Sequence, residues 1–178
     1  ESYSIAKIAG IKMIQAYRKQ YGCDFISLMP TNLYGENDNF HSYNSHVVPA
    51  LIKKIYNAKK NKQNSLMLWG TGSPKRDLLY VGDLAEAIIM LTENYSDYEP
   101  INVGSNTEIT ISQLSKKISK MLNYQGKILF NSKFPNGTIR KFLSNKKIKK
   151  LGWSPKTNLD KGLEQTIKWF LKNEKKIQ

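Results

Sequence analysis

The sequence predicts an α/β domain, because short apolar runs that suit strands alternate with longer segments of helical periodicity. The strand-like runs are 24–29, 65–69, 78–81, 100–103 and 127–130. The helical segments are 2–20, 46–60, 83–95, 112–123 and 159–172. No internal repeat interrupts this order. With 178 residues, 40% of them hydrophobic, the chain is long enough to bury a core.

The first elements place a long loop behind a strand. Apolar residues recur at near-helical spacing from residue 2 until Gly22 ends the pattern. The following apolar run ends at Pro30, which has no N–H to give to a sheet. Residues 30–45 are rich in Asn, Gly, Asp and Ser, so we expect one irregular loop. Such loops at the carboxyl ends of strands carry function in α/β proteins, and we expect the site there.

The later elements follow the same local signals. The strand at 65–69 ends at a Gly-Thr-Gly-Ser-Pro turn. Asp83 is expected to begin one helix and Ser112 to cap the next. The closing helix at 159–172 is amphipathic. We expect Trp153 and Trp169 in the core, and Cys23 buried at a strand edge.

The composition indicates a cytoplasmic protein with a surplus of positive charge. The formal net charge is +14. Much of it lies in lysine runs at 59–62, 146–150 and 172–176, which we interpret as solvated helix faces and ends. No aromatic-interleaved basic groove accompanies these runs, so we expect no nucleic acid partner. No apolar run is long enough for a membrane span, no signal peptide is recognisable, and no metal site is expected. The single cysteine suits a reducing compartment.

A tyrosine and a lysine share one face of the first helix. Tyr3 and Lys7 are four residues apart, so the phenol and the ammonium lie one above the other. A nearby cation favours the phenolate form, which lets the phenol exchange a proton with a carbonyl or an alkoxide. Carbonyl reductases need this chemistry. The spacing alone is common on helices, so the rest of the sequence must decide.

Three further motifs follow in order. They read Pro30-Thr-Asn-Leu-Tyr-Gly35, Asn44-Ser-His46-Val-Val-Pro-Ala-Leu51 and Arg76-Asp-Leu-Leu-Tyr-Val-Gly-Asp83. With Tyr3-Ser-Ile-Ala-Lys7, they resemble the GDP-L-fucose synthase family of extended short-chain dehydrogenases, over essentially the whole chain. The first and last of these four motifs indicate only the wider superfamily. The two between them separate this family from epimerases and dehydratases of the same fold.

The resemblance implies NADPH-dependent epimerisation and reduction of GDP-4-keto-6-deoxy-mannose to GDP-L-fucose. It makes Tyr3 the catalytic acid, and Lys7 the residue that holds the nicotinamide ribose and favours the phenolate. His46 would be the general acid of epimerisation and would also touch the cofactor. The nicotinamide would be lined by Pro30, Thr31, Asn32 and Leu33. The family's catalytic serine and cysteine, and a glycine-rich dinucleotide turn, are expected upstream of this chain.

The resemblance also implies a GDP-sugar site. Its residues would be Lys54, Trp69, Arg76, Asn136 and Lys141. Two of them depart from the family, which commonly has arginine at Lys54 and aspartate at Asn136. Lysine keeps the charge but loses the bidentate fork. An altered guanine or ribose contact at Asn136 leaves the base and the exact sugar open.

The implied fold is the C-terminal part of a Rossmann-like extended short-chain dehydrogenase with a smaller α/β substrate-binding domain. Residues 1–45 and 78–104 would belong to the NADP-binding domain, and 46–77 and 105–178 to the substrate domain. The full-length protein is expected to be a homodimer, and this chain alone to be inactive. Two alternatives stay open: a reductase of a related GDP-4-keto sugar without full epimerisation, and a non-catalytic module that binds nucleotide sugars or nucleic acid.

Overall fold

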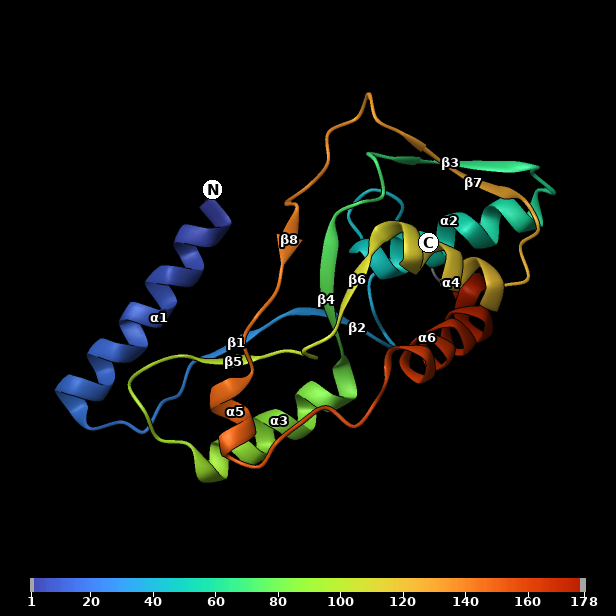
Figure 1. Ribbon diagram of the computed structural model, residues 1–178. Helices are drawn as coiled ribbons and strands as arrows, with labels where there is room; N and C mark the ends of the chain where they lie inside the picture. The colour runs from blue at the N-terminus through green and yellow to red at the C-terminus, as the bar shows by residue number, and fades with distance from the viewer. Residues whose placement is uncertain (1, 177–178) are drawn as a thin grey trace.

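The computed structural model describes residues 2–176 and confirms the α/β class (Figure 1). Its helices are α1 (Ser2–Tyr21), α2 (Val47–Lys60), α3 (Val81–Asn94), α4 (Ile111–Met121), α5 (Lys146–Lys150), α6 (Leu159–Asn173) and the 3-10 turn η1 (Glu174–Lys176). Its strands are β1 (Leu28–Pro30), β2 (Asn32–Tyr34), β3 (Ser65–Trp69), β4 (Lys75–Tyr80), β5 (Ile101–Val103), β6 (Glu108–Thr110), β7 (Lys127–Asn131) and β8 (Arg140–Lys141).

The strands pair mostly in parallel, as helical crossovers require. β1 pairs with β5, β2 with β4, and β3 with β7, all in parallel. β4 is the centre of the sheet, because it also pairs with β6 antiparallel and with β8 in parallel. Thr31 lies between β1 and β2, and its N–H donates to the carbonyl of Val103 at 2.9 Å. The backbone therefore changes its pairing partner at Thr31, from β5 before this residue to β4 after it.

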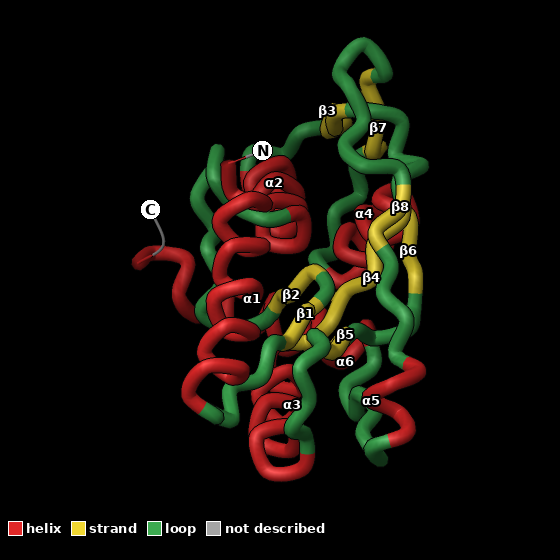
Figure 2. The backbone as a smooth tube through the Cα atoms, turned by 90° about the vertical axis from the view of Figure 1, so that its left-hand side faces the viewer, coloured by secondary structure: helices red, strands yellow, loops and turns green. Residues whose placement is uncertain are grey.

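The larger hydrophobic core lies among α2, α4, α6 and the β3–β7 pair. Each helix gives it an apolar stripe at helical spacing. Its buried members include Val48, Leu51, Ile52, Ile55, Leu68, Leu114, Ile118, Leu163, Ile167 and Phe170. Figure 2 shows the same grouping from the side, with β3 and β7 above these helices.

A smaller core packs α3 and α5 against β1 and β5. Its buried members are Leu79, Leu84, Ala87, Leu91, Tyr95, Ile101, Val103, Ile148 and Trp153. Ile148 and Trp153 come from the stretch that the sequence assigned to the substrate domain. They nevertheless pack on the strands assigned to the NADP-binding domain, so the C-terminal stretch contacts both parts of the fold. The division into two domains stays a prediction.

Helix α1 stands at the edge of the molecule (Figure 1). Of its 20 residues only Gln15 is buried, and its side-chain amide donates to the carbonyl of Tyr98 at 3.2 Å. Ile5, Ile8 and Met13 are exposed. The apolar residues that gave α1 its periodicity are therefore mostly not covered by the rest of the chain.

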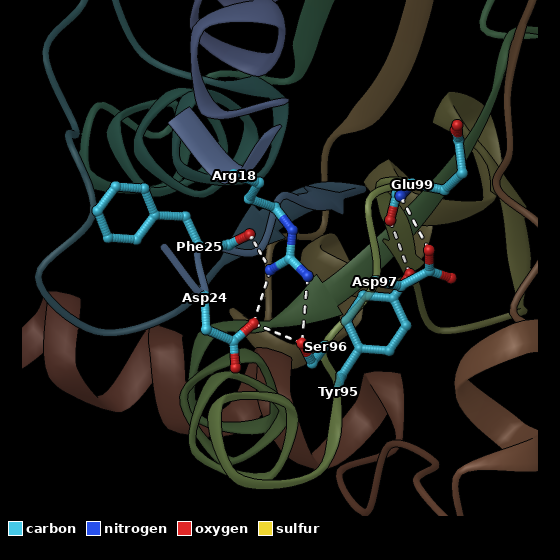
Figure 3. A network of polar contacts seen from close by, with 7 residues as sticks. All are labelled: Arg18, Asp24, Phe25, Tyr95, Ser96, Asp97 and Glu99. Carbon is cyan, nitrogen blue, oxygen red and sulfur yellow. Dashed lines mark hydrogen bonds and ion pairs between the residues drawn. The ribbon is translucent and has the colours of Figure 1, made fainter. Parts of the chain in front are cut away.

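A polar network fixes the C-terminal end of α1 (Figure 3). Nη1 of Arg18 donates to Asp24 Oδ1 at 2.6 Å and to the carbonyl of Phe25 at 2.8 Å. Nη2 of Arg18 donates to the hydroxyl of Ser96 at 3.1 Å. The Ser96 hydroxyl and Arg18 hold the pKa of Asp24 below its ordinary value. One guanidinium thus joins α1, the chain before β1 and the loop after α3.

Four local expectations were wrong. Residues 30–45 are not one irregular loop, because β2 forms there on β4. The cap of α4 is Thr110 rather than Ser112, since Thr110 and Gln113 form a reciprocal capping box. Helix α3 begins at Val81, before Asp83. Cys23 is half-buried and lies outside any strand.

The two tryptophans expected in the core differ. Trp153 is buried in the smaller core. Trp169 is only half-buried and packs against the edge of the larger core, where it stacks on Phe40. The lysine runs at 59–62, 146–150 and 172–176 do lie on exposed helix surfaces and ends, as expected.

Candidate functional site

Tyr3 and Lys7 lie together on α1. The ammonium of Lys7 is 5.5 Å from the centroid of the Tyr3 ring, as the four-residue spacing predicts. Tyr3 is 74% exposed. Among residues 2–176, no hydrogen bond joins this pair to the other predicted site residues. In the described chain, the phenol of Tyr3 and the ammonium of Lys7 are therefore both exposed to solvent.

The 30–33 segment is fixed at the carboxyl end of β1, the edge at which open α/β sheets bind ligands. The Thr31 hydroxyl donates to the carbonyl of Asp77 at 3.0 Å. The side-chain amide of Asn32 donates to the same carbonyl at 2.9 Å. Because both polar side chains are used in this way, Pro30 and Leu33 remain as the apolar part of the segment.

The carboxyl group of Asp77 is fully buried beneath this segment. Its Oδ1 accepts from the backbone N–H of Ser105 at 3.0 Å and from the Ser105 hydroxyl. Burial raises the pKa of Asp77, and the bonds from Ser105 oppose that effect. A Cβ at Gly104 would lie 2.5 Å from Asp77 Oδ2, so only glycine fits at that position. Asp77 therefore joins β4 to two other segments. Its side-chain carboxyl group bonds to the turn after β5, and its backbone carbonyl bonds to the 30–33 segment.

His46 is the N-cap residue of α2. Its backbone is extended, with φ −70° and ψ 170°, and its imidazole makes no capping hydrogen bond. The side chain is exposed. Burial raises the pKa of Asp38, whereas the proximity of His46 lowers it. His46 is thus an accessible titratable group at a helix start, with a carboxyl group near it.

A cavity of about 150 Å³ lies between α2, β3, β4 and the loop 132–139. Val47, Trp69, Arg76 and Asn136 are among its lining residues. The Asn136 side-chain oxygen accepts from the backbone N–H of Thr71 at 2.9 Å, which ties the loop to the end of β3. This approach requires a glycine at residue 70, where a Cβ would be 2.4 Å from that oxygen and φ is +78°.

The guanidinium of Arg76 is fixed in the cavity wall. Nη1 donates to the carbonyls of Lys75 and Thr138, both at 2.7 Å. Burial lowers the pKa of Arg76. Within residues 2–176, no hydrogen bond uses the donors on Nη2 and Nε. Those donors are free for a ligand without any rearrangement of the Nη1 contacts.

Two more cations stand beside this cavity. The ammonium of Lys54 lies 5.5 Å from the centroid of the Trp69 indole. Lys141 on β8 is the register partner of Arg76 on β4. A flat aromatic surface next to two or three cations suits a ligand that combines an aromatic ring with anionic groups.

The structure thus places three predicted residues in one cavity wall, Trp69, Arg76 and Asn136, with Lys54 over the Trp69 ring and Lys141 paired with Arg76 through the backbone. His46 precedes Val47 of the cavity wall. The sequence analysis missed Asp77 and Phe134, whose ring stacks on Trp69. In the sequence, the only signal for Asp77 is its position directly after Arg76 in the 76–83 motif. Phe134 could have been noticed as an aromatic residue in a loop rich in Pro, Asn and Gly.

The described chain holds neither a candidate membrane-spanning helix nor a candidate metal-binding cluster. No helix within residues 2–176 combines the length and the apolar character that a bilayer span needs. In the same residues, no three His, Cys, Asp or Glu side chains are grouped so that they could hold a metal ion.

Comparison with known proteins gives consistent similarities. The model of the "NAD dependent epimerase/dehydratase family" matches residues 1–104. A probable GDP-L-fucose synthase 1 of Oryza sativa subsp. japonica is 51% identical over 173 residues, which cover 97% of this chain and 53% of that protein. A crystal structure of a GDP-L-fucose synthetase from Naegleria fowleri bound to NADP superposes with a TM-score of 0.91 at 30% identity, covering 97% of this chain and 56% of that chain.

A third similarity concerns another GDP-sugar reductase. The crystal structure of a GDP-6-OMe-4-keto-L-xylo-heptose reductase from C. jejuni superposes with a TM-score of 0.88 at 27% identity, covering 97% of this chain and 61% of that chain. These neighbours confirm the predicted Rossmann-like, extended short-chain dehydrogenase fold. The present chain spans only about half the length of the relatives it matches.

Replacement of Asp77 tests the buried contact under the 30–33 segment. Asp77→Ala removes the acceptor of the Ser105 N–H and one of the two acceptors of the Ser105 hydroxyl at a half-buried position, so we expect a loss of about 1–3 kcal/mol in the free energy of unfolding. Urea denaturation followed by circular dichroism measures it. Asp77→Asn is the control, because it keeps the size and one acceptor oxygen, and its loss should be smaller.

The same two proteins give a pH test. Burial raises the pKa of Asp77, so ionisation of this carboxyl opposes folding. Relative to Asp77→Asn, the wild type should therefore lose stability as the pH rises through the range in which Asp77 ionises. Equal stability of the wild type and Asp77→Ala would contradict the role assigned to this carboxyl group.

Proposed function

The chain belongs to the NAD dependent epimerase/dehydratase family, and on that premise we propose that the full-length protein is an NADPH-dependent epimerase and reductase that makes GDP-L-fucose from GDP-4-keto-6-deoxy-mannose. The cavity beside Trp69 and Arg76 is the main structural support. An indole and several cations converge there from separate segments, as a purine nucleoside diphosphate requires. We further propose that this chain is the C-terminal half of the enzyme and that an upstream half supplies the dinucleotide-binding turn.

The residues of this chain fit a nicotinamide cofactor. The 30–33 segment lies at the carboxyl edge of β1 and β5, and its polar side chains are tied to Asp77. Pro30 is exposed and remains to contact a flat, uncharged ring, whereas the half-buried Leu33 also packs against the smaller core. Lys7 would hold the ribose. NADPH, when bound, supplies the hydride that reduces the ketone.

The proposed chemistry uses two proton donors of this chain. In epimerisation, a base from the upstream half removes a proton from a carbon beside the ketone, and His46 returns a proton to the opposite face of the enolate. In reduction, Tyr3 gives its phenolic proton to the oxygen of the former ketone, and Lys7 stabilises the phenolate that results. The exposure of both side chains in this chain leaves them accessible to a substrate.

A second candidate is reduction of a related GDP-4-keto sugar without full epimerisation. The similarity to a GDP-4-keto-heptose reductase supports it. Because the nucleotide cavity would serve both substrates, the stereochemistry of the product decides between them. The assay incubates the full-length protein with NADPH and GDP-4-keto-6-deoxy-mannose. GDP-L-fucose as product supports the first candidate, and an unepimerised alcohol supports the second.

The remaining proposals concern partners and location. The single cysteine agrees with a reducing compartment, and we propose the cytoplasm. The proposed partners are a GDP-sugar and a second copy of the protein. We propose neither nucleic acid nor membrane as a partner, because no aromatic residue stands between the lysines within any of the three runs.

Tyr3→Phe tests the catalytic acid. The change removes a proton donor and little volume, so in the full-length enzyme we expect kcat to fall by about two to four orders of magnitude with KM nearly unchanged. Steady-state NADPH oxidation measures both constants. Tyr43→Phe, at an exposed tyrosine elsewhere, is the matched control. A change confined to KM would make Tyr3 a binding residue instead.

His46→Gln tests the assignment of the two protons. We expect it to slow epimerisation more than reduction, because the ketone oxygen receives its proton from Tyr3. Exchange of substrate C–H for solvent deuterium follows the first step, and NADPH consumption follows the second. Normal deuterium exchange with collapsed hydride transfer would reassign His46 to cofactor positioning.

The exposed apolar face of α1 supports the proposed homodimer. Ile5, Ile8 and Met13 are 57–61% exposed, and a bare apolar stripe of this kind is commonly covered by a partner. The full-length protein should therefore run as a two-fold dimer in light scattering, and Ile8→Glu with Met13→Glu should shift it towards monomer. A monomeric wild type at tens of micromolar would refute this interface.

A further inference from the structure

Two aromatic rings stack on each other at the surface beside the cavity. The centroids of Trp69 and Phe134 are 4.8 Å apart, and their planes differ by 10°. The rings are not part of the core, because Trp69 is 68% and Phe134 40% exposed. Trp69 follows buried Leu68 on β3 and so faces away from the larger core. The pair therefore adds little to core packing and presents flat apolar surface to solvent.

The loop that carries Phe134 is fastened at several points. It connects β7 to β8 and rises above β3 in both views (Figures 1 and 2). Near its start, the N–H of Lys133 donates to Asn131 Oδ1 at 3.0 Å. Beyond Phe134, Asn136 accepts from Thr71, and the carbonyl of Ile139 accepts from the N–H of Lys75 at 2.8 Å. The ring of Phe134 is thus held on Trp69 by a defined backbone.

One ring of the aromatic pair and one of the cations line the same cavity. Trp69 and Arg76 both line it, and so do Pro135 and Asn136, which directly follow Phe134. Aromatic rings in contact have centroids about 4.5–7 Å apart, so a spacing of 4.8 Å leaves no space for a third ring between them. A planar ligand group must therefore add to the outside of the pair. Its anionic part could then reach the unused donors of Arg76.

We infer that Phe134 is a specificity-determining residue that, with Trp69, forms the stacking surface for the purine base of the nucleoside diphosphate. This rests on the proposed function, since it names how that substrate's base is held. Stacking on a pair whose rings are already aligned costs less ordering than stacking on a single mobile indole. Phe134 acts on the base alone, whereas Arg76, Lys54 and Lys141 act on the phosphates.

The test compares ligands with and without a base. Titration calorimetry measures binding of GDP and of inorganic pyrophosphate to the full-length protein and to Phe134→Ala. We expect the variant to bind GDP about tenfold more weakly and pyrophosphate as well as the wild type does. Phe134→Tyr keeps a stacking ring and should restore GDP affinity. Ile139→Ala, which shortens another exposed side chain of the same loop, should change neither ligand.

The other outcomes distinguish failure of this inference from failure of the proposed function. If Phe134→Ala binds GDP as tightly as the wild type, or more tightly, the inference is wrong while the proposed function stands. An equal loss of GDP and pyrophosphate affinity would also overturn it, because the effect would then lie in the loop or the phosphate site. If the wild type itself does not bind GDP, the proposed substrate falls and the inference falls with it. Thermal melting shows whether each variant is folded.

Discussion

A buried carboxyl group on β4 holds together the parts of the molecule that carry the proposed chemistry. The side-chain carboxyl group of Asp77 accepts hydrogen bonds from Ser105 after β5. The backbone carbonyl of Asp77 accepts hydrogen bonds from Thr31 and Asn32. Arg76, the residue before Asp77, places its guanidinium in the wall of the cavity beside Trp69. The Ser105 bonds to Oδ1 offset part of the cost of burying this carboxyl group, whose Oδ2 has no hydrogen-bond partner among residues 2–176, so separation of these segments would be unfavourable. The proposed cofactor segment and Arg76 are thereby fixed relative to each other.

Different residue types contribute different properties to the cavity and its surroundings. Arginine and the lysines supply charge, which acts over several ångströms and tolerates small displacements. The aromatic pair supplies shape, which requires contact. Gly70 and Asn136 also position the loop, because their close contact allows the loop 132–139 to approach β3 closely enough for Phe134 to reach Trp69. If Phe134 has the inferred role, specificity for a base also depends on residues that position the loop.

Helix α1 differs, since it carries the proposed catalytic pair although only one of its 20 residues is buried. Its attachment depends on Arg18 and Gln15, both in its C-terminal half. Tyr3 and Lys7 lie at the other end, where the helix has no covering partner within residues 2–176. Under the proposed function, the upstream half and a second copy would cover this helix and set the position of the phenol.

The sequence alone determined what depends on local pattern. Helices α2 and α6 lie within about a residue of their predicted bounds, because an apolar stripe and its caps are local properties. The motifs around Tyr3, His46 and Arg76 likewise named the family. Only the tertiary structure decided the rest. Strands β6 and β8 have too few residues for any periodicity and exist because β4 offers them hydrogen bonds. Asp77 and Phe134 became functional candidates only when folding brought Ser105 and Trp69 beside them, from 28 residues away for Ser105, since hydrogen bonding and stacking depend on distance in space rather than along the chain.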